Sequence, residues 1–231
     1  MPFQTSVAAQ QSPGIEGGFY GNNPIYTLTN PDEGMWVAGA SGVTIGQFAW
    51  ADTVTGAVSS THPGKAAALV RHGFVHRDQP AVITGLLSGT SNLVVAGQGI
   101  DLLEDGSVWA RFVAGATIGQ KVYMAYADGA VTAAATGAAA TVTRSVTTTN
   151  TSTAISYTGG AIFPGQPVSG TGIPAGAYIV SVNATAGTAV LSAAATASGT
   201  VTGTFTTNFE TAFVVRSVAA AGELAKISVR G

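Results

Sequence analysis

Two stretches of the chain repeat one pattern. Residues 42–58 read GVTIGQFAWADTVTGAV, and residues 115–131 read GATIGQKVYMAYADGAV. Each contains Thr-Ile-Gly-Gln, then an alternating apolar run, an aspartate and Gly-Ala-Val. A tetrapeptide alone carries little weight in a chain with 31 glycines, but the shared order carries more. We interpret the two stretches as copies of one β-unit that pack together. The alternative is chance similarity between two ordinary hairpins.

Composition narrows the class of protein. The 231 residues suit one large all-β domain, or one domain with a smaller insert, because glycine, threonine and valine favour strands and tight turns. Only 9% of the residues are charged, against roughly 25% in a typical soluble domain, and no basic stripe suggests a nucleic-acid partner. No apolar run nears the ~20 residues that span a membrane, and the first residues do not read as a signal peptide. The absence of cysteine excludes disulfides and thiolate chemistry.

Residues 1–35 are predicted to form an extended N-terminal arm. Four prolines interrupt this segment, and proline fixes φ and removes a hydrogen-bond donor, so a helix is excluded. Between the prolines lie isolated aromatic residues: Phe3, Phe19, Tyr20 and Tyr26. Aromatic side chains in an irregular segment need a surface to bury against, so we expect the arm to lie on its own domain or to reach a partner. A frayed terminus is the alternative.

Residues 36–139 and 207–231 are predicted to form the main β-domain. Within it, residues 71–78 alternate as a strand, with Arg71 and Arg77 on one face and His72 and His76 on the other. Residues 81–83 read as a short buried strand, and residues 66–70 as a single helical turn. Glu104-Asp105-Gly106 indicates a hairpin whose return strand is residues 108–113. Two strands, residues 211–216 and 224–229, would close the domain.

Residues 140–206 are predicted to be a small β-domain inserted into the main one. No charged residue occurs from Ser145 to Phe209. Low complexity alone would suggest a linker, but residues 178–182 alternate and Pro-Gly and Pro-Ala-Gly turn signals recur. Six apolar residues could make its core: Ile162, Phe163, Val168, Ile173, Ile179 and Leu191. Because strands of the main domain would then pair across the insert, slow folding is expected.

No constellation of residues points to catalysis or to a bound ion. His72 and His76 on a strand lie about 13 Å apart at roughly 3.3 Å per residue, too far for one metal, and His62 adds no ligand pattern. The acids Asp101, Glu104 and Asp105 match no calcium loop. No nucleophile elbow or phosphate loop is present. We therefore expect no enzyme activity, no cofactor and no metal. Trp36, Trp50 and Trp109 are expected to be core anchors, with an interface role as the alternative.

Several ordered blocks of the sequence resemble a known protein family. They read SPGIEGGFYGNNP, GVTIGQFAWAD, GFVHRDQPAVITGLL, LVVAGQGIDLLEDGSVWARF and GATIGQKVYM. The order and content of these blocks resemble the structural cement, or head decoration, proteins of tailed bacteriophages and prophages. The resemblance covers roughly residues 12–132 and 208–231. Gln47 departs from it, since the family more often carries arginine there. The segment FPGQPVSGTGIPAGAYIVSVNATAGTAVLSAAATA resembles short β-modules of phage tail and other virion proteins.

The resemblance implies a virion structural protein. Its main domain would be a β-barrel or β-sandwich, for example a jelly roll. It would bind the outside of the capsid, cement neighbouring major capsid protein subunits and form a homodimer or homotrimer. The insert would project outward and adhere weakly, for instance to glycans. The candidate residues for contacts with capsid or subunits are Phe3, Phe19, Tyr20, Tyr26, Trp36, Arg71 and Arg77.

Two other classes of function stay open from the residues. One is a phage tail or tail-fibre component, although no long β-repeat or heptad supports a fibre. The other is a secreted carbohydrate-active enzyme, for which Asp101, Glu104 and Asp128 would be the acids to test.

Overall fold

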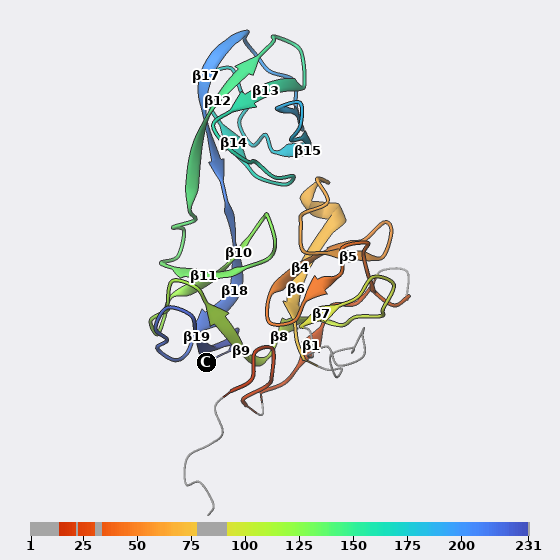
Figure 1. Cartoon of the computed structure of the whole chain (residues 1–231), viewed down its shortest axis with the longest axis vertical. Coiled ribbons are helices and arrows are strands. Elements are labelled where there is room, and N and C mark those ends of the chain that lie inside the picture. Colours follow the sequence, from red (N-terminus) through yellow and green to blue (C-terminus); the bar gives the residue numbers. More distant parts are fainter. Residues whose placement is uncertain (1–13, 22, 31–33, 78–91, 231) are drawn as a thin grey trace, which may run out of the picture.

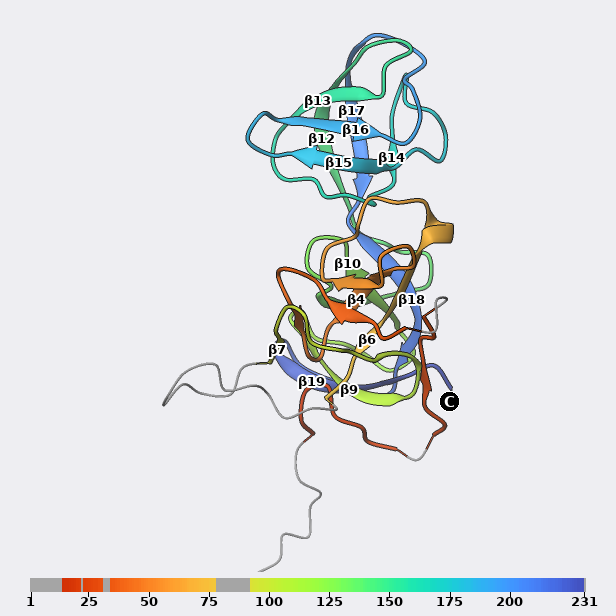
Figure 2. The same cartoon turned by 90° about the vertical axis from the view of Figure 1, so that its right-hand side faces the viewer.

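The protein is built almost entirely from β-strands arranged as curled sheets (Figures 1 and 2). A computed structural model of the chain describes residues 14–21, 23–30, 34–77 and 92–230. One sheet has the order β1-β8-β6-β4-β5-β2. Its strands are β1 (Tyr26–Thr27), β8 (Leu102–Asp105), β6 (Val70–Val75), β4 (Phe48–Asp52), β5 (Ala57–Ser59) and β2 (Val37–Ala38). A two-stranded ladder of β3 (Val43–Thr44) and β7 (Leu93–Val94) lies beside it, and a 3-10 turn, η1 (Ala67–Leu69), precedes β6.

A second sheet completes the main domain, and a third makes the insert. The second has the order β11-β10-β18-β19-β9. Its strands are β11 (Val131–Ala134), β10 (Lys121–Ala125), β18 (Asn208–Val215), β19 (Glu223–Ser228) and β9 (Ser107–Phe112). The third has the order β14-β17-β12-β13-β16-β15. Its strands are β14 (Val168–Ser169), β17 (Gly199–Thr206), β12 (Thr141–Thr148), β13 (Ala154–Thr158), β16 (Thr188–Leu191) and β15 (Ile179–Asn183).

The hydrophobic core of the main domain lies between its two sheets. Phe48 and Phe74 of the first sheet meet Phe213 of the second, with ring centroids 5.3 and 5.5 Å from that of Phe48. A separate cluster covers the other face of the first sheet, where Trp36, Val43 and other side chains are buried. Because β4 has a core on each face, all five of its residues are buried. The expected all-β fold, a barrel or sandwich, is confirmed.

The repeated sequence pattern corresponds to a structural repeat. Strands β5-β4-β6-β8 stand in the same order as β11-β10-β18-β19, and β4 and β10 occupy identical positions within the two repeats. Gly46 and Gly119 both have φ +88°, a conformation that favours glycine. Three backbone hydrogen bonds recur in equivalent places. In the first copy, Gly46 N donates to Val75 O, Val75 N to Gln47 O and Gly56 N to Asp52 O. In the second copy, Gly119 N donates to Val215 O, Val215 N to Gln120 O and Gly129 N to Ala125 O. Two copies of one β-unit are confirmed, and chance similarity is excluded.

The two copies turn opposite faces of the repeated sheet toward the core that they share. In the first copy, Phe48 and Trp50 point into the core between the sheets. In the second, Val122 and Met124 point into it, and these match Ala49 and Ala51 of the first copy. Successive residues of a strand face opposite sides, so the two copies present opposite faces to the shared core. The two aspartates of the pattern are not equivalent, because Asp52 ends β4 whereas Asp128 follows β10.

The third sheet interrupts the second copy at one connection. In the first copy, β5 leads to β6 through residues 60–69, whereas in the second copy β11 leads to β18 through the whole third sheet. Strands β12 and β17 pair along their length from Thr141–Thr206 to Thr148–Gly199. The third sheet has its own core around Phe205, Ile179 and Leu191. Phe163, expected in that core, packs instead against the core of the main domain.

The segment Glu104–Gly106 is a corner between sheets, so the predicted hairpin is wrong. β8 pairs with β6 and β1, while β9 pairs with β19. Asp105, Gly106 and Ser107 carry the chain from one sheet to the other. Turn-forming residues between two apolar runs are common to hairpins and to such corners, so the local sequence does not separate them. The predicted strand at residues 81–83 lies outside the described residues, and the helical turn at residues 66–70 is present as η1.

Candidate interaction surfaces

The described part of the N-terminal arm lies on its own domain. Gly17 N donates to Trp109 O at 2.8 Å, and Trp109 N donates to Gly18 O at 2.9 Å. Further along, Leu28 N donates to Leu102 O at 2.8 Å. The described arm residues 14–21 and 23–30 therefore run beside β9 and β8 (Figures 1 and 2).

Arg77 fastens this arm to the domain. Its Nε donates to Glu16 O at 3.1 Å, and its Nη2 donates to Asn92 Oδ1 at 2.6 Å. The guanidinium thus bridges the arm and the loop before β7. Among the predicted contact residues, Arg77 is a positioning residue within this chain.

The aromatic residues of the arm remain partly at the surface. Phe19 is 39% exposed and Tyr26 is 50% exposed. The Tyr20 ring lies 5.9 Å from the Trp109 ring, and Lys226 Nζ is 5.3 Å from the centre of each. The Arg230 guanidinium lies 5.0 Å over the Tyr26 ring. Phe3 lies outside the described residues.

Trp36 and Arg71 occupy different environments from one another. Trp36 is 2% exposed, and its Nε1 donates to Leu28 O at 2.8 Å, so it anchors the core and the arm rather than facing solvent. Arg71 has a half-exposed side chain that pairs with Glu104. Of the seven predicted residues, Phe19, Tyr20 and Tyr26 lie together on the arm, and Arg71 lies apart from them on β6.

Apolar side chains accompany the exposed arm. Besides Phe19 and Tyr26, the exposed ones on the arm and the nearby β2 and β7 are Ile15, Ile25, Met35, Val37 and Leu93. The arm and β1 lie at the end of the molecule opposite the inserted sheet (Figure 1). We call these seven exposed side chains the arm surface.

A cavity of about 520 Å³ lies where the insert meets the main domain. The insert contributes Gly165, Pro167, Gly176 and Tyr178 to its lining, and β18 contributes Phe209. The first repeat and the turn after β10 line the remainder with Trp50, His62, Lys65, Ala67, Val70, Arg71, His72 and Tyr126. We call this cavity the aromatic cleft. Within it, Trp50 and Tyr126 stack at 5.4 Å, and the His72 and Phe209 rings meet at 4.7 Å.

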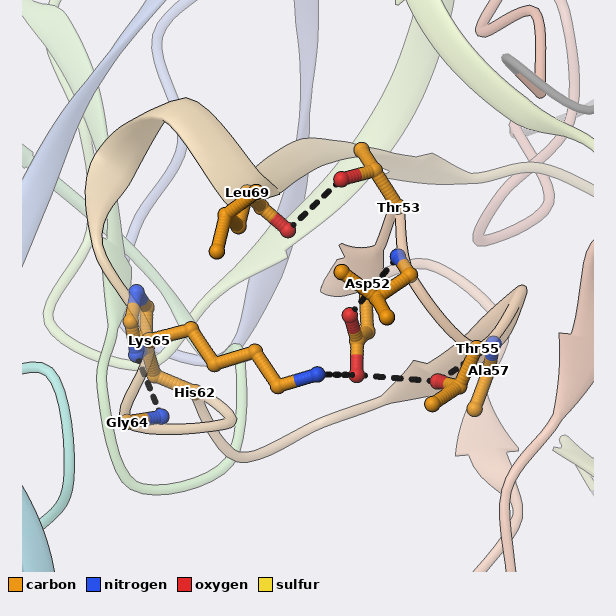
Figure 3. A network of polar contacts seen from close by, with 9 residues as sticks. Asp52, Thr53, Thr55, Ala57, His62, Gly64, Lys65 and Leu69 are labelled. Atoms are coloured by element: carbon orange, nitrogen blue, oxygen red, sulfur yellow. Dashed lines mark hydrogen bonds and ion pairs between the residues drawn. The ribbon is translucent and has the colours of Figure 1, made fainter.

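An ion-paired network holds the wall of the aromatic cleft (Figure 3). Asp52 Oδ2 accepts from Lys65 Nζ at 2.5 Å and from Thr55 Oγ1 at 2.9 Å, and Asp52 Oδ1 accepts from Val54 N at 3.0 Å. Burial alone would raise the pKa of Asp52, but these hydrogen bonds and the charge of Lys65 outweigh it and lower that pKa. The loop from β5 to β6 is thereby tied to the end of β4.

Three titratable groups of the aromatic cleft, His62, His72 and Tyr126, are uncharged at neutral pH. Burial lowers the pKa of His62 to about 4 and that of His72 to about 4, and burial raises the pKa of Tyr126 to about 12. His62 Nδ1 accepts from Gly64 N at 3.0 Å, so its other nitrogen carries the proton. The two cations of the lining, Lys65 and Arg71, are each paired with a carboxylate.

Glycines let the insert sit close to the main domain. A Cβ on Gly64 would lie 1.8 Å from Val180 O, and a Cβ on Gly165 would lie 2.2 Å from the His62 ring. Both glycines have positive φ, +71° and +80°. The contact between the two parts therefore depends on the absence of a side chain at these two positions.

The sequence did not reveal the aromatic cleft, because its lining comes from segments far apart in the chain. Trp50, His72 and Tyr126 belong to β4, β6 and the turn after β10, and each alternates as an ordinary strand residue would. The one local signal is that Trp50, His62 and His72 lie in or near the connection from β5 to β6, whose equivalent in the second repeat holds the insert.

The described residues contain neither a cluster of metal ligands nor a membrane-spanning helix. Within residues 14–21, 23–30, 34–77 and 92–230, no three histidines, aspartates or glutamates gather closely enough to hold a metal ion. In the same residues, no helix has the length and apolar character needed to cross a membrane. Asp105 of the acidic cluster pairs with Arg230, and Asp78 lies outside the described residues.

Comparison with known proteins places this architecture in a family. A family model for the XM1 gp53 minor capsid protein matches residues 3–162, well over half of the chain. Among curated proteins, none matches the chain. The matched residues include nearly all of the arm, the first repeat, and β10 and β11 of the second repeat, and they end within the insert. The protein is therefore a structural component of the phage virion, associated with the capsid. The chain belongs to the XM1 gp53 minor capsid protein family.

Proposed function

We propose that this protein binds the outer surface of the phage capsid and cements neighbouring major capsid protein subunits. The observation that carries the proposal is the polarity of the molecule. The arm surface lies at one end, and the insert lies at the other (Figure 1). One end can therefore bind the shell while the other projects outward. The role needs no catalysis.

The arm surface has the character of a protein interface. It combines exposed aromatic and aliphatic side chains such as Phe19, Tyr26 and Ile25 with the cation Arg230 stacked on Tyr26. Aromatic and arginine residues are enriched where protein interfaces bury their central contacts. The arm could also add a strand to a shell sheet, although the backbone of Gly17, Gly18 and Leu28 already pairs with its own domain. Residues 1–13 lie outside the described residues.

Shell symmetry supports a homodimer or homotrimer of the protein. A capsid offers equivalent binding sites around its two-fold and three-fold axes, and a protein that bridges them meets copies of itself. Light scattering on the purified chain, and again on chain released from shells, measures this state. A monomer in both samples would remove the oligomer from the proposal.

Co-sedimentation with undecorated shells tests the cementing role. Ile25→Asp combined with Tyr26→Ser places a charge and a small polar group on the exposed arm surface, and thermal unfolding of the variant shows that it folds. We expect this variant to lose at least about tenfold in affinity, since buried interface anchors contribute about 1.4 kcal/mol or more. The matched control is Val190→Asp, a similarly exposed position on the insert at 37%. Equal binding by both variants would contradict the arm surface as the shell contact.

A position in the tail is the second candidate location. Gold-labelled antibody against the chain, viewed on whole virions, separates heads from tails. The family description of a minor capsid protein favours the head. Label confined to tails would replace the cementing proposal with a tail-component role.

The outward end is proposed to be weakly adhesive. The insert carries no charge from Ser145 to Phe209, and its exposed strands are rich in threonine and serine. Such a surface suits contact with neutral polar molecules at the cell surface, such as glycans.

A further inference from the structure

We infer that the aromatic cleft between insert and main domain is a binding site for a neutral sugar ring. This inference deepens the adhesive role proposed above, because it names a ligand class and places its site. The site is shared by the two parts of the chain rather than carried by the insert alone. Its argument rests on the lining residues, their polar atoms and their charges.

The lining offers apolar ring surface to a flat ligand. Phe209, Tyr178 and His72 are partly exposed, and they stand at the margin of the cluster formed by Trp50 and Tyr126. A pyranose presents a face of C–H groups that packs against aromatic rings. The cavity volume of about 520 Å³ lies within the range of small-molecule sites, which are mostly apolar with few polar groups.

The lining also holds polar groups that lack partners in the chain. Trp50 Nε1 is buried, and among the described residues it has no hydrogen-bond partner. Within the same residues, nothing hydrogen-bonds the Tyr126 hydroxyl or the His72 ring. His62 has a second nitrogen that carries a proton. Buried polar groups are normally satisfied, so the buried Trp50 Nε1 marks a place for a ligand acceptor, and the Tyr126 hydroxyl and the two histidines add donors and acceptors around the same cavity.

The charges of the site favour a neutral ligand. Lys65 is paired with Asp52, and Arg71 is paired with Glu104, so neither cation is left for an anion. Both histidines are neutral. His72 offers one donor and one acceptor, whereas His62 offers only a donor, because its Nδ1 already accepts from Gly64 N. Hydroxyl groups both donate and accept, which matches this set. A carboxylate or phosphate anion can only accept hydrogen bonds, so it would leave the acceptor atoms of the site without a partner.

Titration of the full-length chain with methyl glycosides tests the inference without capsids. The probes are methyl β-glucopyranoside, methyl β-galactopyranoside, methyl α-mannopyranoside and methyl N-acetyl-β-glucosaminide, each up to 20 mM, followed by tryptophan fluorescence and saturation-transfer NMR. We expect at least one probe to saturate with a millimolar Kd. Tyr126→Phe removes only the unpartnered hydroxyl and is expected to raise that Kd at least fivefold. Phe209→Ala removes a ring at the margin and is expected to raise it about tenfold.

Tyr26→Phe is the matched control, since it makes the same change at the other end of the molecule and is expected to leave the Kd unchanged. Thermal unfolding of each variant shows that it folds. The inference is overturned if no glycoside saturates at 20 mM, or if Tyr126→Phe and Tyr26→Phe bind alike. A fifth probe, N-acetyl-phenylalaninamide, represents an aromatic side chain of a protein partner. Saturation by that probe and by no glycoside would assign the cleft to a protein contact instead. Shell binding is measured separately, so its failure and the failure of sugar binding are distinguishable.

Discussion

At the scale of single residues, two glycines from the second repeat can be compared directly. Gly129 has φ +75°, its carbonyl accepts from Phe48 N at 3.0 Å, and a Cβ there would lie 1.8 Å from Phe48 O. Gly119 has φ +88°, but no atom lies within 4 Å of its Cβ position. Gly119→Ala should therefore cost only backbone strain, about 1–2 kcal/mol of unfolding free energy. Gly129→Ala adds a backbone clash and should cost about 2–5 kcal/mol. Urea unfolding of both variants measures the difference, and equal losses would refute the close approach.

The buried histidines of the aromatic cleft make stability depend on pH. The unfolded chain protonates His62 and His72 near pH 6.5, whereas the folded chain holds both pKa values at about 4. Between these limits the unfolded state binds more protons, so stability falls as pH drops from 6.5 to 4 and levels off below. For His72, burial is the main cause, Glu104 opposes it and Arg71 adds to it. The lowered pKa of Asp52 places its contribution below about pH 4, outside this window.

We expect the two histidines together to lower the free energy of unfolding by roughly 1–3 kcal/mol at pH 4.5 relative to pH 7. The loss stays in this range because both rings keep some contact with solvent. Chemical denaturation at the two pH values measures the loss. The double variant His62→Gln and His72→Gln removes both titrations and should flatten the dependence. An unchanged slope in that variant would assign the pH effect to other groups.

At the scale of elements, the insert is joined to the main domain by two neighbouring chain ends. Thr207 N donates to Ala140 O at 2.8 Å, and β12 and β17 then pair from Thr141–Thr206 onward. Replacing residues 141–206 by two glycines should therefore leave the sheet of β10, β11 and β18 intact. The variant should lose about 2–4 kcal/mol of unfolding free energy, because Trp50 and Tyr126 lose part of their cover and Phe163 is removed from the margin of the main-domain core. Near-UV circular dichroism and thermal unfolding measure the fold, and shell binding is expected to persist. Loss of shell binding in a folded variant would make the insert part of the capsid contact.

The same scale shows what local sequence can and cannot specify. The turn of the repeat was predictable, because Gly46 and Gly119 occupy a conformation that glycine favours and the flanking residues match. The corner at Gly106 was not, because a hairpin and a change of sheet use the same turn residues. Phe163 was assigned to the wrong core, since its apolar side chain predicts burial but not which core the connection between β13 and β14 reaches. The aromatic cleft depends on docking of two folded parts, and no single stretch of sequence encodes that contact.

At the scale of the whole molecule, the insert decides how the second repeat closes. β10 must pair with β18 across residues 135–207, and a flexible connection of that length would cost about 1–2 kcal/mol more than a short turn. A folded insert removes this cost, because pairing of β12 with β17 already brings Ala140 beside Thr207. Slow folding is predicted because the insert divides the main domain in the sequence. It should then appear only when the insert cannot fold before β10 pairs with β18.

Phe205→Ala tests this order of events. Phe205 is fully buried in the core of the insert, and its truncation should cost about 3–5 kcal/mol within that part. Stopped-flow refolding, followed by the tryptophans of the main domain, should slow by about 5- to 20-fold in this variant. Thr200→Ala, an exposed position on the same strand, should leave the rate unchanged, and so should the variant without residues 141–206. If Phe205→Ala and Thr200→Ala refold alike, the two halves of the second repeat find each other without help from the insert. In that case the main domain would set its own folding rate, and the insert would act only after assembly.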